Sequence, residues 1–142
     1  MNSRAHSGFT VSEILTVLVA IVVVAAVAVP MWRAHQLRTR RDDAVEALLA
    51  VQAAQDKYFG TNARYANEAQ LGIEGTSRRG LYEITLSKSN DDLGYWATAR
   101  VMVHAGQAAD TRCAELRIDQ NGRRFAVDSD GVDRSADCWR SH

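Results

Sequence analysis

A run of 19 residues without a charged side chain, Ile14–Trp32, lies close to the start of this 142-residue chain. At a rise of about 1.5 Å per residue, a helix of that length reaches across the hydrocarbon core of a bilayer. The run therefore indicates that the N-terminal part either crosses a membrane or targets the chain to one. A secretory signal peptide and a plain signal anchor both fit, because Arg4 supplies a basic start and 26–28 offers a small-residue cleavage site.

Glu13 stands at the N-terminal edge of the apolar run, directly before Ile14. A carboxylate in that position is costly in lipid, so it needs a partner or a role. Neither a signal peptide nor a plain anchor requires an acid there. One explanation is local, since Thr10 followed three residues later by Glu13 has the spacing of a capping box. A capping role and a role in contacting another molecule are compatible.

The segment 7–15 resembles the class III signal of type IV pilins and pseudopilins: a short leader ending in glycine, then Phe-Thr-x-x-Glu and an apolar stretch. The resemblance implies that prepilin peptidase cuts between Gly8 and Phe9 and N-methylates Phe9. It also implies that Glu13 neutralises the N-terminal amine of the adjacent subunit during assembly, because each buried charge is tolerable only when it is paired. Pro30 matches the family's helix proline and is expected to kink or loosen the helix.

Charge is unevenly divided along the chain. Residues 1–41 hold five basic residues and one acid, whereas residues 42–142 hold 12 basic and 16 acidic residues. A net-acidic C-terminal part is a poor default for binding nucleic acid. The arginines that follow the apolar run would place that part in the cytoplasm by the positive-inside rule. The resemblance instead implies a bacterial inner-membrane protein with a periplasmic C-terminal domain, which later joins the extracellular pilus.

Beyond Trp32, the apolar spacing predicts that one helix continues to about Phe59. Gly60 is a reasonable stop, and residues 60–80 are predicted to form a connecting loop. A charged surface patch is expected over 38–43. One face of this helix would pack within the subunit, and its members are Leu37, Ala44, Leu48, Val51 and Tyr58. The polar residues Arg41 and Gln55 interrupt this face. The apolar residues Val45 and Leu49 widen it.

Four strands are predicted in the C-terminal part. Alternation of apolar and polar residues marks 82–87 and 95–105, and the apolar face of the second of these holds Ala97 and Ala99. A third strand is expected over 113–119 and a short fourth over 123–127. Asn121-Gly122 between them is the strongest hairpin-turn signal in the chain. Residues 128–139 are expected to form an irregular tail.

A long helix followed by an antiparallel meander is an α+β architecture, with the small four-stranded sheet packed on the C-terminal half of the helix. It resembles the type IV pilin fold. The predicted parts are a leader (1–8), a transmembrane and assembly helix (9–32), the C-terminal half of the helix (33–59), the loop (60–80), and the sheet with a disulfide-bounded region (81–142).

The stretches 106–122 and 136–139 are similar to PilE-type minor pilins, a group that includes the DNA-uptake pilin ComP. This resemblance implies a disulfide-bounded C-terminal loop, closed here by Cys113 and Cys138. Export of this part of the chain would also favour the bridge, because disulfides persist in oxidising compartments.

No catalytic constellation, phosphate loop or Cys/His metal cluster stands out, so we expect no enzyme activity and no cofactor. Asp128, Asp130 and Asp133 have a spacing that suits calcium, but the register of an EF-hand is missing. Arginines beside Tyr82 and Trp96 could form a local basic face for a DNA backbone. These possible DNA contacts are Arg78, Arg79, Arg112, Arg117, Arg123 and Arg124.

The combined reading is a minor type IV pilin. By resemblance, such a subunit primes assembly of the pilus or joins it, and supports adhesion, twitching motility and DNA uptake. Its expected partners are other pilins, prepilin peptidase and the inner-membrane assembly machinery. A DNA receptor pilin for natural transformation, a type II secretion pseudopilin and a major pilin remain alternatives. A secreted protein that loses its apolar segment is the alternative from another class.

Overall fold

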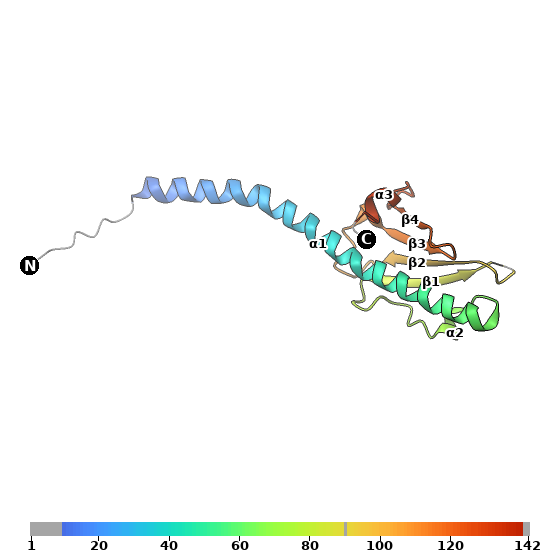
Figure 1. Ribbon diagram of the computed structural model, residues 1–142. Helices are drawn as coiled ribbons and strands as arrows, with labels where there is room; N and C mark the ends of the chain where they lie inside the picture. The colour runs from blue at the N-terminus through green and yellow to red at the C-terminus, as the bar shows by residue number, and fades with distance from the viewer. Residues whose placement is uncertain (1–9, 90, 141–142) are drawn as a thin grey trace, which may run out of the picture. The chain divides into compact units, whose positions relative to one another are not determined.

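The computed structural model describes residues 10–89 and 91–140. The chain divides into two compact units, one ending at Gln36 and the other beginning at Leu37. One helix runs through the boundary, and all strands lie in the second unit (Figure 1). In chain order the elements are α1 (Val11–Asn62), α2 (Glu68–Leu71), β1 (Tyr82–Lys88), β2 (Tyr95–Val101), the 3₁₀ turn η1 (Thr111–Cys113), β3 (Glu115–Asp119), β4 (Arg124–Val127) and α3 (Ser135–Cys138).

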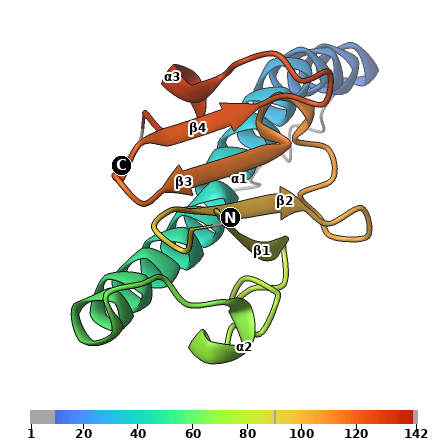
Figure 2. The same ribbon diagram turned by 90° about the vertical axis from the view of Figure 1, so that its right-hand side faces the viewer.

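The four strands form one antiparallel sheet in the order β1-β2-β3-β4, as Figure 2 shows. Sequential neighbours pair throughout, which is the meander predicted from the sequence. The β3–β4 turn is the one that Asn121-Gly122 indicated. Gly122 has a φ of +72°, a conformation in which glycine carries no steric penalty, and its N–H donates to the Asp119 carbonyl at 2.9 Å. The predicted α+β class is confirmed.

The core lies between one face of the sheet and α1 from Leu37 onward, and Figure 2 shows the strands lying across this part of the helix. Ala44, Leu48 and Val51 supply the buried face of α1, as their spacing predicted. Val45 is buried beside them, but Leu49 points to solvent, so the face is widened on one side only. On the sheet, the buried apolar residues are Tyr82, Ile84, Tyr95, Ala97, Ala99, Leu116, Ile118 and Ala126.

The outer edge of β1 is occupied by the segment that precedes it. Thr76 forms an antiparallel bridge with Glu83, and the N–H of Ile84 donates to the Gly75 carbonyl at 2.9 Å. The segment belongs to residues 60–80, which were predicted to be a loop. It also contains the short helix α2, which begins with a reciprocal capping box and was missed because four residues are too few to show a helical period.

The outer edge of β4 is occupied by the tail that follows it. Val127 forms an antiparallel bridge with Asp133, and the N–H of Arg134 donates to the Ala126 carbonyl at 2.8 Å. The tail was predicted to be irregular throughout, but it ends in α3. Both edges of the sheet are therefore covered by the chain itself.

Three predicted boundaries were wrong by two residues or more. Helix α1 passes Gly60 and ends at Asn62, where Ala63 takes a φ of +52°. Strand β2 ends at Val101, not at 105, because a turn follows in which the Ala105 N–H donates to the Met102 carbonyl at 3.0 Å. Strand β3 begins after the 3₁₀ turn that holds Cys113. Beside β2 and β3, turns replace the regular strand that the side chains alone would allow, whereas α1 extends beyond its expected stop.

Candidate functional site: the apolar helix and the outer face of the sheet

The N-terminal part of α1 presents apolar side chains all around and buries none of them within the subunit. Large aliphatic residues from Val11 to Met31 and the indole of Trp32 are exposed. Within the described residues, α1 is the one helix long and apolar enough to cross a membrane. Exposed surface of this size calls for lipid or for another apolar helix, because its transfer from water is favourable.

Glu13 forms the capping box that its spacing predicted. The backbone N–H and the hydroxyl of Thr10 each donate to one carboxylate oxygen of Glu13 at 2.8 Å, and the Glu13 N–H donates back to the Thr10 hydroxyl at 3.3 Å. The carboxylate remains exposed, so the cap leaves it accessible to another molecule. Gly8 and Phe9, the predicted cleavage and methylation positions, lie outside the described residues.

Pro30 lies inside α1, and the helix continues through it. Proline has no N–H, so the helix lacks one internal hydrogen bond at this point. Its role in loosening the helix stays a prediction.

A buried ion pair fastens α1 to the segment after β2. The Arg41 guanidinium donates to both carboxylate oxygens of Asp110, at 2.6 and 2.8 Å. Burial acts to lower the pKa of Arg41, but the hydrogen bond and charge of Asp110 outweigh it and hold that pKa above its ordinary value. The Gln107 amide joins the cluster by donating to Asp110 at 2.8 Å and to the Leu37 carbonyl at 3.0 Å. Arg41 therefore anchors α1 to this segment, whereas the sequence suggested only that Arg41 interrupts the apolar face of the helix.

Asp43 corrects the prediction of a charged surface patch over 38–43, because it is buried. Its carboxylate accepts hydrogen bonds from the Ser77 hydroxyl at 2.5 Å and from the backbone N–H of Arg79 at 3.0 Å. The Ser77 oxygen in turn accepts the N–H of Tyr82 at 3.0 Å. Asp43 thus positions the segment that covers the edge of β1.

Cys113 and Cys138 form the predicted disulfide, with 5.9 Å between their Cα atoms and a separation of 25 positions in the sequence. The bond joins η1 to α3. Next to it, the buried Trp139 donates its indole N–H to the Phe125 carbonyl at 2.9 Å. The C-terminal region is therefore held to η1 covalently and to β4 by the indole hydrogen bond of Trp139.

The six arginines predicted as DNA contacts do not gather on one face. Arg78 and Arg79 lie before β1, and the other four lie in or beside η1, β3 and β4, toward the opposite edge of the sheet. Tyr82 is buried and has no surface to offer a ligand. Several of the arginines already have a partner within the chain: Arg78 pairs with Glu46, Arg112 with Asp137, Arg117 with Glu115 and Arg123 with Asp119, while Arg124 lies 5.2 Å from the ring of Trp139.

Glu115 sits between two arginines on the outer face of the sheet. Arg100 donates to one of its oxygens at 2.6 and 3.0 Å, and Arg117 pairs with the other oxygen. Burial acts to raise the pKa of Glu115, but the hydrogen bonds from both arginines outweigh it, so that pKa lies below its ordinary value. Both guanidinium groups remain exposed. The cluster of Arg100, Glu115 and Arg117 therefore carries one excess positive charge.

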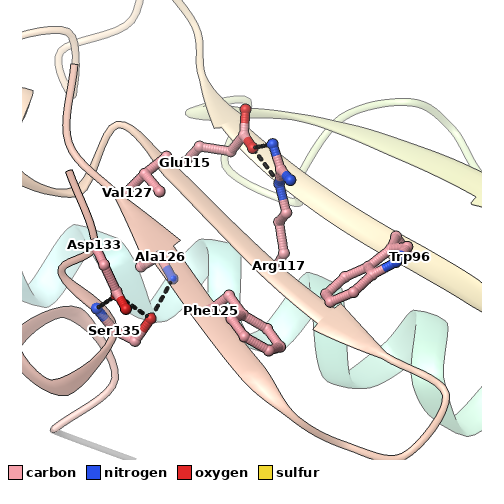
Figure 3. Close-up of a pocket in the computed structure, with 8 residues that line it drawn as sticks. All are labelled: Trp96, Glu115, Arg117, Phe125, Ala126, Val127, Asp133 and Ser135. Carbon is pink, nitrogen blue, oxygen red and sulfur yellow. Dashed lines mark hydrogen bonds and ion pairs between the residues drawn. The ribbon is translucent and has the colours of Figure 1, made fainter. Parts of the chain in front are cut away.

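A pocket of about 240 Å³ opens beside this cluster on the outer face of β2, β3 and β4 (Figure 3). We call it the sheet-face pocket. The rings of Trp96 and Phe125 meet edge to face, with centroids 5.2 Å apart, at one end. Asp133 and Ser135 lie at the other end, as Figure 3 shows. Its lining residues are Trp96, Glu115, Arg117, Phe125, Ala126, Val127, Asp133 and Ser135.

The sequence predicted only the β2 side of this pocket. Alternation along β2 placed Trp96 and Arg100 on the face opposite Ala97, and that placement is correct. Phe125 was not singled out, because a four-residue strand shows little alternation. The approach of Asp133 depends on the tail folding back along β4, which no local pattern indicates.

The predicted calcium residues use their carboxylates within the chain. One oxygen of Asp128 accepts the N–H groups of Asp130 and Val132, at 3.0 and 2.9 Å, and the other accepts from Arg134 at 3.1 Å. Asp133 accepts from Ser135. Within 10–89 and 91–140, no group of three His, Cys, Asp or Glu side chains is arranged to hold a metal ion. The spacing that suits calcium therefore does not bring these carboxylates together as a site within the described residues.

Comparison with known proteins gives three similarities. The family described as "Type IV minor pilin ComP, DNA uptake sequence receptor" matches residues 30–117. The type IV major pilin protein PilA of Myxococcus xanthus is 34% identical over 78 residues, which are 53% of this chain and 36% of that protein, so the match spans about a third of the relative's length. A type IV pilin structure from Shewanella oneidensis has a TM-score of 0.49 and 19% identity, over 62% of this chain and 89% of that one.

Proposed function

The chain belongs to the family of type IV minor pilins described as ComP, DNA uptake sequence receptor, and from this membership we propose that it is a pilus subunit that assembles through α1. The proposal rests on the family match over 30–117 together with the part of α1 that precedes residue 30. That part of the helix exposes an unbroken apolar surface. The action is association, not catalysis. Helices from several subunits would pack together and bury surface that lipid otherwise covers.

In the proposed pathway, prepilin peptidase removes residues 1–8 and methylates Phe9. The subunit waits in the bacterial inner membrane with the sheet domain in the periplasm, and then enters the extracellular pilus. Glu13 supplies the charge that the N-terminal amine of an adjacent subunit needs in a low dielectric. Its exposed position supports this role, since the capping box uses Thr10 of the same chain and leaves the carboxylate accessible.

Mass spectrometry of the mature N-terminus tests the processing step. The expected product begins with N-methylated Phe9, and Gly8→Ala is expected to leave the chain uncut in the membrane. Normal trimming of Gly8→Ala, or a mature chain beginning near Val29, would contradict the proposal. The second result would indicate a secreted protein with an ordinary signal peptide.

The role of Glu13 is tested by two substitutions that separate its charge from its cap. Glu13→Gln keeps a side chain that completes a capping box but carries no charge, whereas Glu13→Ala removes both. We expect both variants to be processed normally and to be depleted from sheared pili. If Glu13→Gln assembles like wild type and only Glu13→Ala fails, the carboxylate acts as a cap alone.

We further propose that the sheet domain contacts DNA during uptake, a candidate that the family description and the excess positive charge of the Arg100, Glu115 and Arg117 cluster favour. The test uses the full-length protein in lipid nanodiscs and a duplex oligonucleotide over a range of salt. Each lost phosphate contact lowers the slope of log affinity against log salt by about 1. Arg117→Gln is therefore expected to lower the slope, and Arg78→Gln, beside the opposite edge of the sheet, is the control.

Absence of duplex binding at low salt would contradict DNA reception and would leave the assembly role standing. Deletion of the gene separates the remaining alternatives. A pilus role predicts loss of motility, adhesion or transformation, whereas a type II secretion pseudopilin predicts loss of secretion. Abundance in sheared pili distinguishes a minor pilin from a major one.

A further inference from the structure

The sheet-face pocket holds two aromatic rings that the fold leaves half open. Trp96 on β2 and Phe125 on β4 are 39% and 38% exposed, although both rings touch each other across β3. Arg117 of β3 pairs directly with Phe125, whereas Trp96 pairs with Asp119, two residues further along β3. Aromatic side chains on an exposed sheet, with arginines on the neighbouring strand, provide a stacking surface next to positive charge.

An exposed guanidinium beside the rings can meet a phosphate. Glu115 is compensated by Arg100 and Arg117 together, and their excess positive charge lies at one end of a pocket whose other end holds the carboxylate of Asp133. The guanidinium groups of Arg100 and Arg117 are exposed on the same face as Trp96, because these three residues alternate with the buried residues of their strands. A phosphate beside the rings would therefore meet an arginine without having to displace a buried carboxylate.

The opposite end of the pocket offers a hydrogen-bond acceptor. One carboxylate oxygen of Asp133 receives both the hydroxyl of Ser135 at 2.6 Å and its N–H at 2.8 Å. These bonds from Ser135 hold the pKa of Asp133 below its ordinary value, so the group is ionised at neutral pH and accepts without donating. The second oxygen forms no hydrogen bond within the described residues and is available to a ligand that carries an N–H.

We propose that the sheet-face pocket binds one unpaired base of single-stranded DNA, with the base stacked on Trp96 and its edge toward Phe125, a neighbouring phosphate at Arg117, and an N–H of the base's pairing edge donated to Asp133. The proposal rests on the proposed contact with DNA and specifies its form. In a duplex, both faces of a base are stacked and the N–H groups of its pairing edge are engaged. An unpaired base presents the face and the edge that this pocket matches.

Fluorescence anisotropy with the full-length protein in lipid nanodiscs tests the proposal. The probes are a labelled single-stranded 12-mer, the duplex of the same sequence, and a 12-mer of abasic sites that keeps the phosphates and lacks the bases. Stacking on one aromatic residue corresponds to roughly a 5- to 140-fold change in affinity. Trp96→Leu is expected to weaken binding of the single strand by a factor in that range, to leave duplex binding unchanged, and to leave the salt slope unchanged.

Three controls keep a loss of binding from being confused with a loss of folding. Trp96→Phe retains an aromatic face and is expected to restore most of the single-strand affinity. Phe59→Leu removes a ring of matched exposure, 36%, at the far end of α1 and is expected to have no effect. The abasic 12-mer is expected to bind wild type about as weakly as the single strand binds Trp96→Leu.

Each other outcome overturns the inference in a different way. If Trp96→Leu binds the single strand within about twofold of wild type, the rings only stabilise the sheet, while duplex binding would keep the DNA function intact. If wild type binds neither the single strand nor the duplex, the proposed DNA contact fails together with the pocket. If a neutral oligosaccharide competes with the single strand and the abasic 12-mer binds as well as the normal one, the occupant is a sugar and not a base.

Discussion

Removing the charge of Asp110 is expected to destabilise the sheet domain more than any comparable change at a surface ion pair. The side chains of Arg41 and Asp110 are only 11% and 2% exposed, and Asp110 accepts three hydrogen bonds from Arg41 and Gln107. Removing one partner of such a pair leaves a buried charge uncompensated and costs about 3–5 kcal/mol. Asp110→Asn keeps the shape and one acceptor, so we expect about 3 kcal/mol, the lower end of that range.

The chain provides a matched control in the pair of Arg78 and Glu46, whose side chains are 75% and 59% exposed. An exposed pair contributes about 0–1 kcal/mol, so Glu46→Gln is expected to be nearly silent. The assay is urea unfolding of the full-length protein in detergent, followed by tryptophan fluorescence. With a slope of about 1.5–2 kcal/mol per molar urea, Asp110→Asn is expected to lower the midpoint by about 1.5–2 M.

Equal midpoints for Asp110→Asn and Glu46→Gln would refute the reasoning, because burial would then confer no special cost on this pair. A double substitution separates the pair from its surroundings. Arg41→Met combined with Asp110→Asn is expected to recover part of the loss, since no buried charge is left without a partner.

Three further changes test other contacts. Replacing Cys113 and Cys138 by serine is expected to lower the free energy of unfolding by about 3.5 kcal/mol for a 25-residue separation, and a reductant added to wild type in the same urea titration should reproduce the loss. Gln55→Leu is expected to cost about 2–4 kcal/mol by calorimetry or urea titration, because the buried amide bonds both the N–H and the carbonyl of Ala66 at 2.9 Å. The folded-state pKa of Glu115 is lowered, so its stabilisation is present above its unfolded pKa of about 4.3 and is lost as pH falls through the folded value. The stability difference between wild type and Glu115→Gln is therefore expected to shrink in titrations below about pH 4, and a constant difference would show that the arginine contacts carry no charge-dependent stability.

Local patterns predicted the elements whose partners are close in sequence or whose period is regular. The alternation in β2 correctly assigned Ala97 to the core and Trp96 to the outer face. The hairpin at Asn121-Gly122 needs only its own residues, because glycine supplies the positive φ. The apolar run before Arg33 is visible as composition alone.

Polar anchors could not be predicted in this way. The sequence places Asp43 in a charged surface patch, because a carboxylate on a helix is usually solvated. Its partner Ser77 is 34 residues away, and Arg41 and Asp110 are 69 residues apart. Helical and strand periods say which face a residue occupies, but not which distant polar group will meet it there. The sheet-face pocket depends on such contacts, so the sequence predicted only part of it.

The covered sheet edges have a consequence for the proposed role as a pilus subunit. A strand with unpaired backbone groups is a template on which another chain can add by main-chain hydrogen bonds, and tight packing raises the rate of that reaction. Here the segment at Thr76 and the tail at Asp133 already fill both template positions. In that role, subunits could be packed side by side along a fibre without competing sheet extension, and the apolar helix would be the surface that joins them.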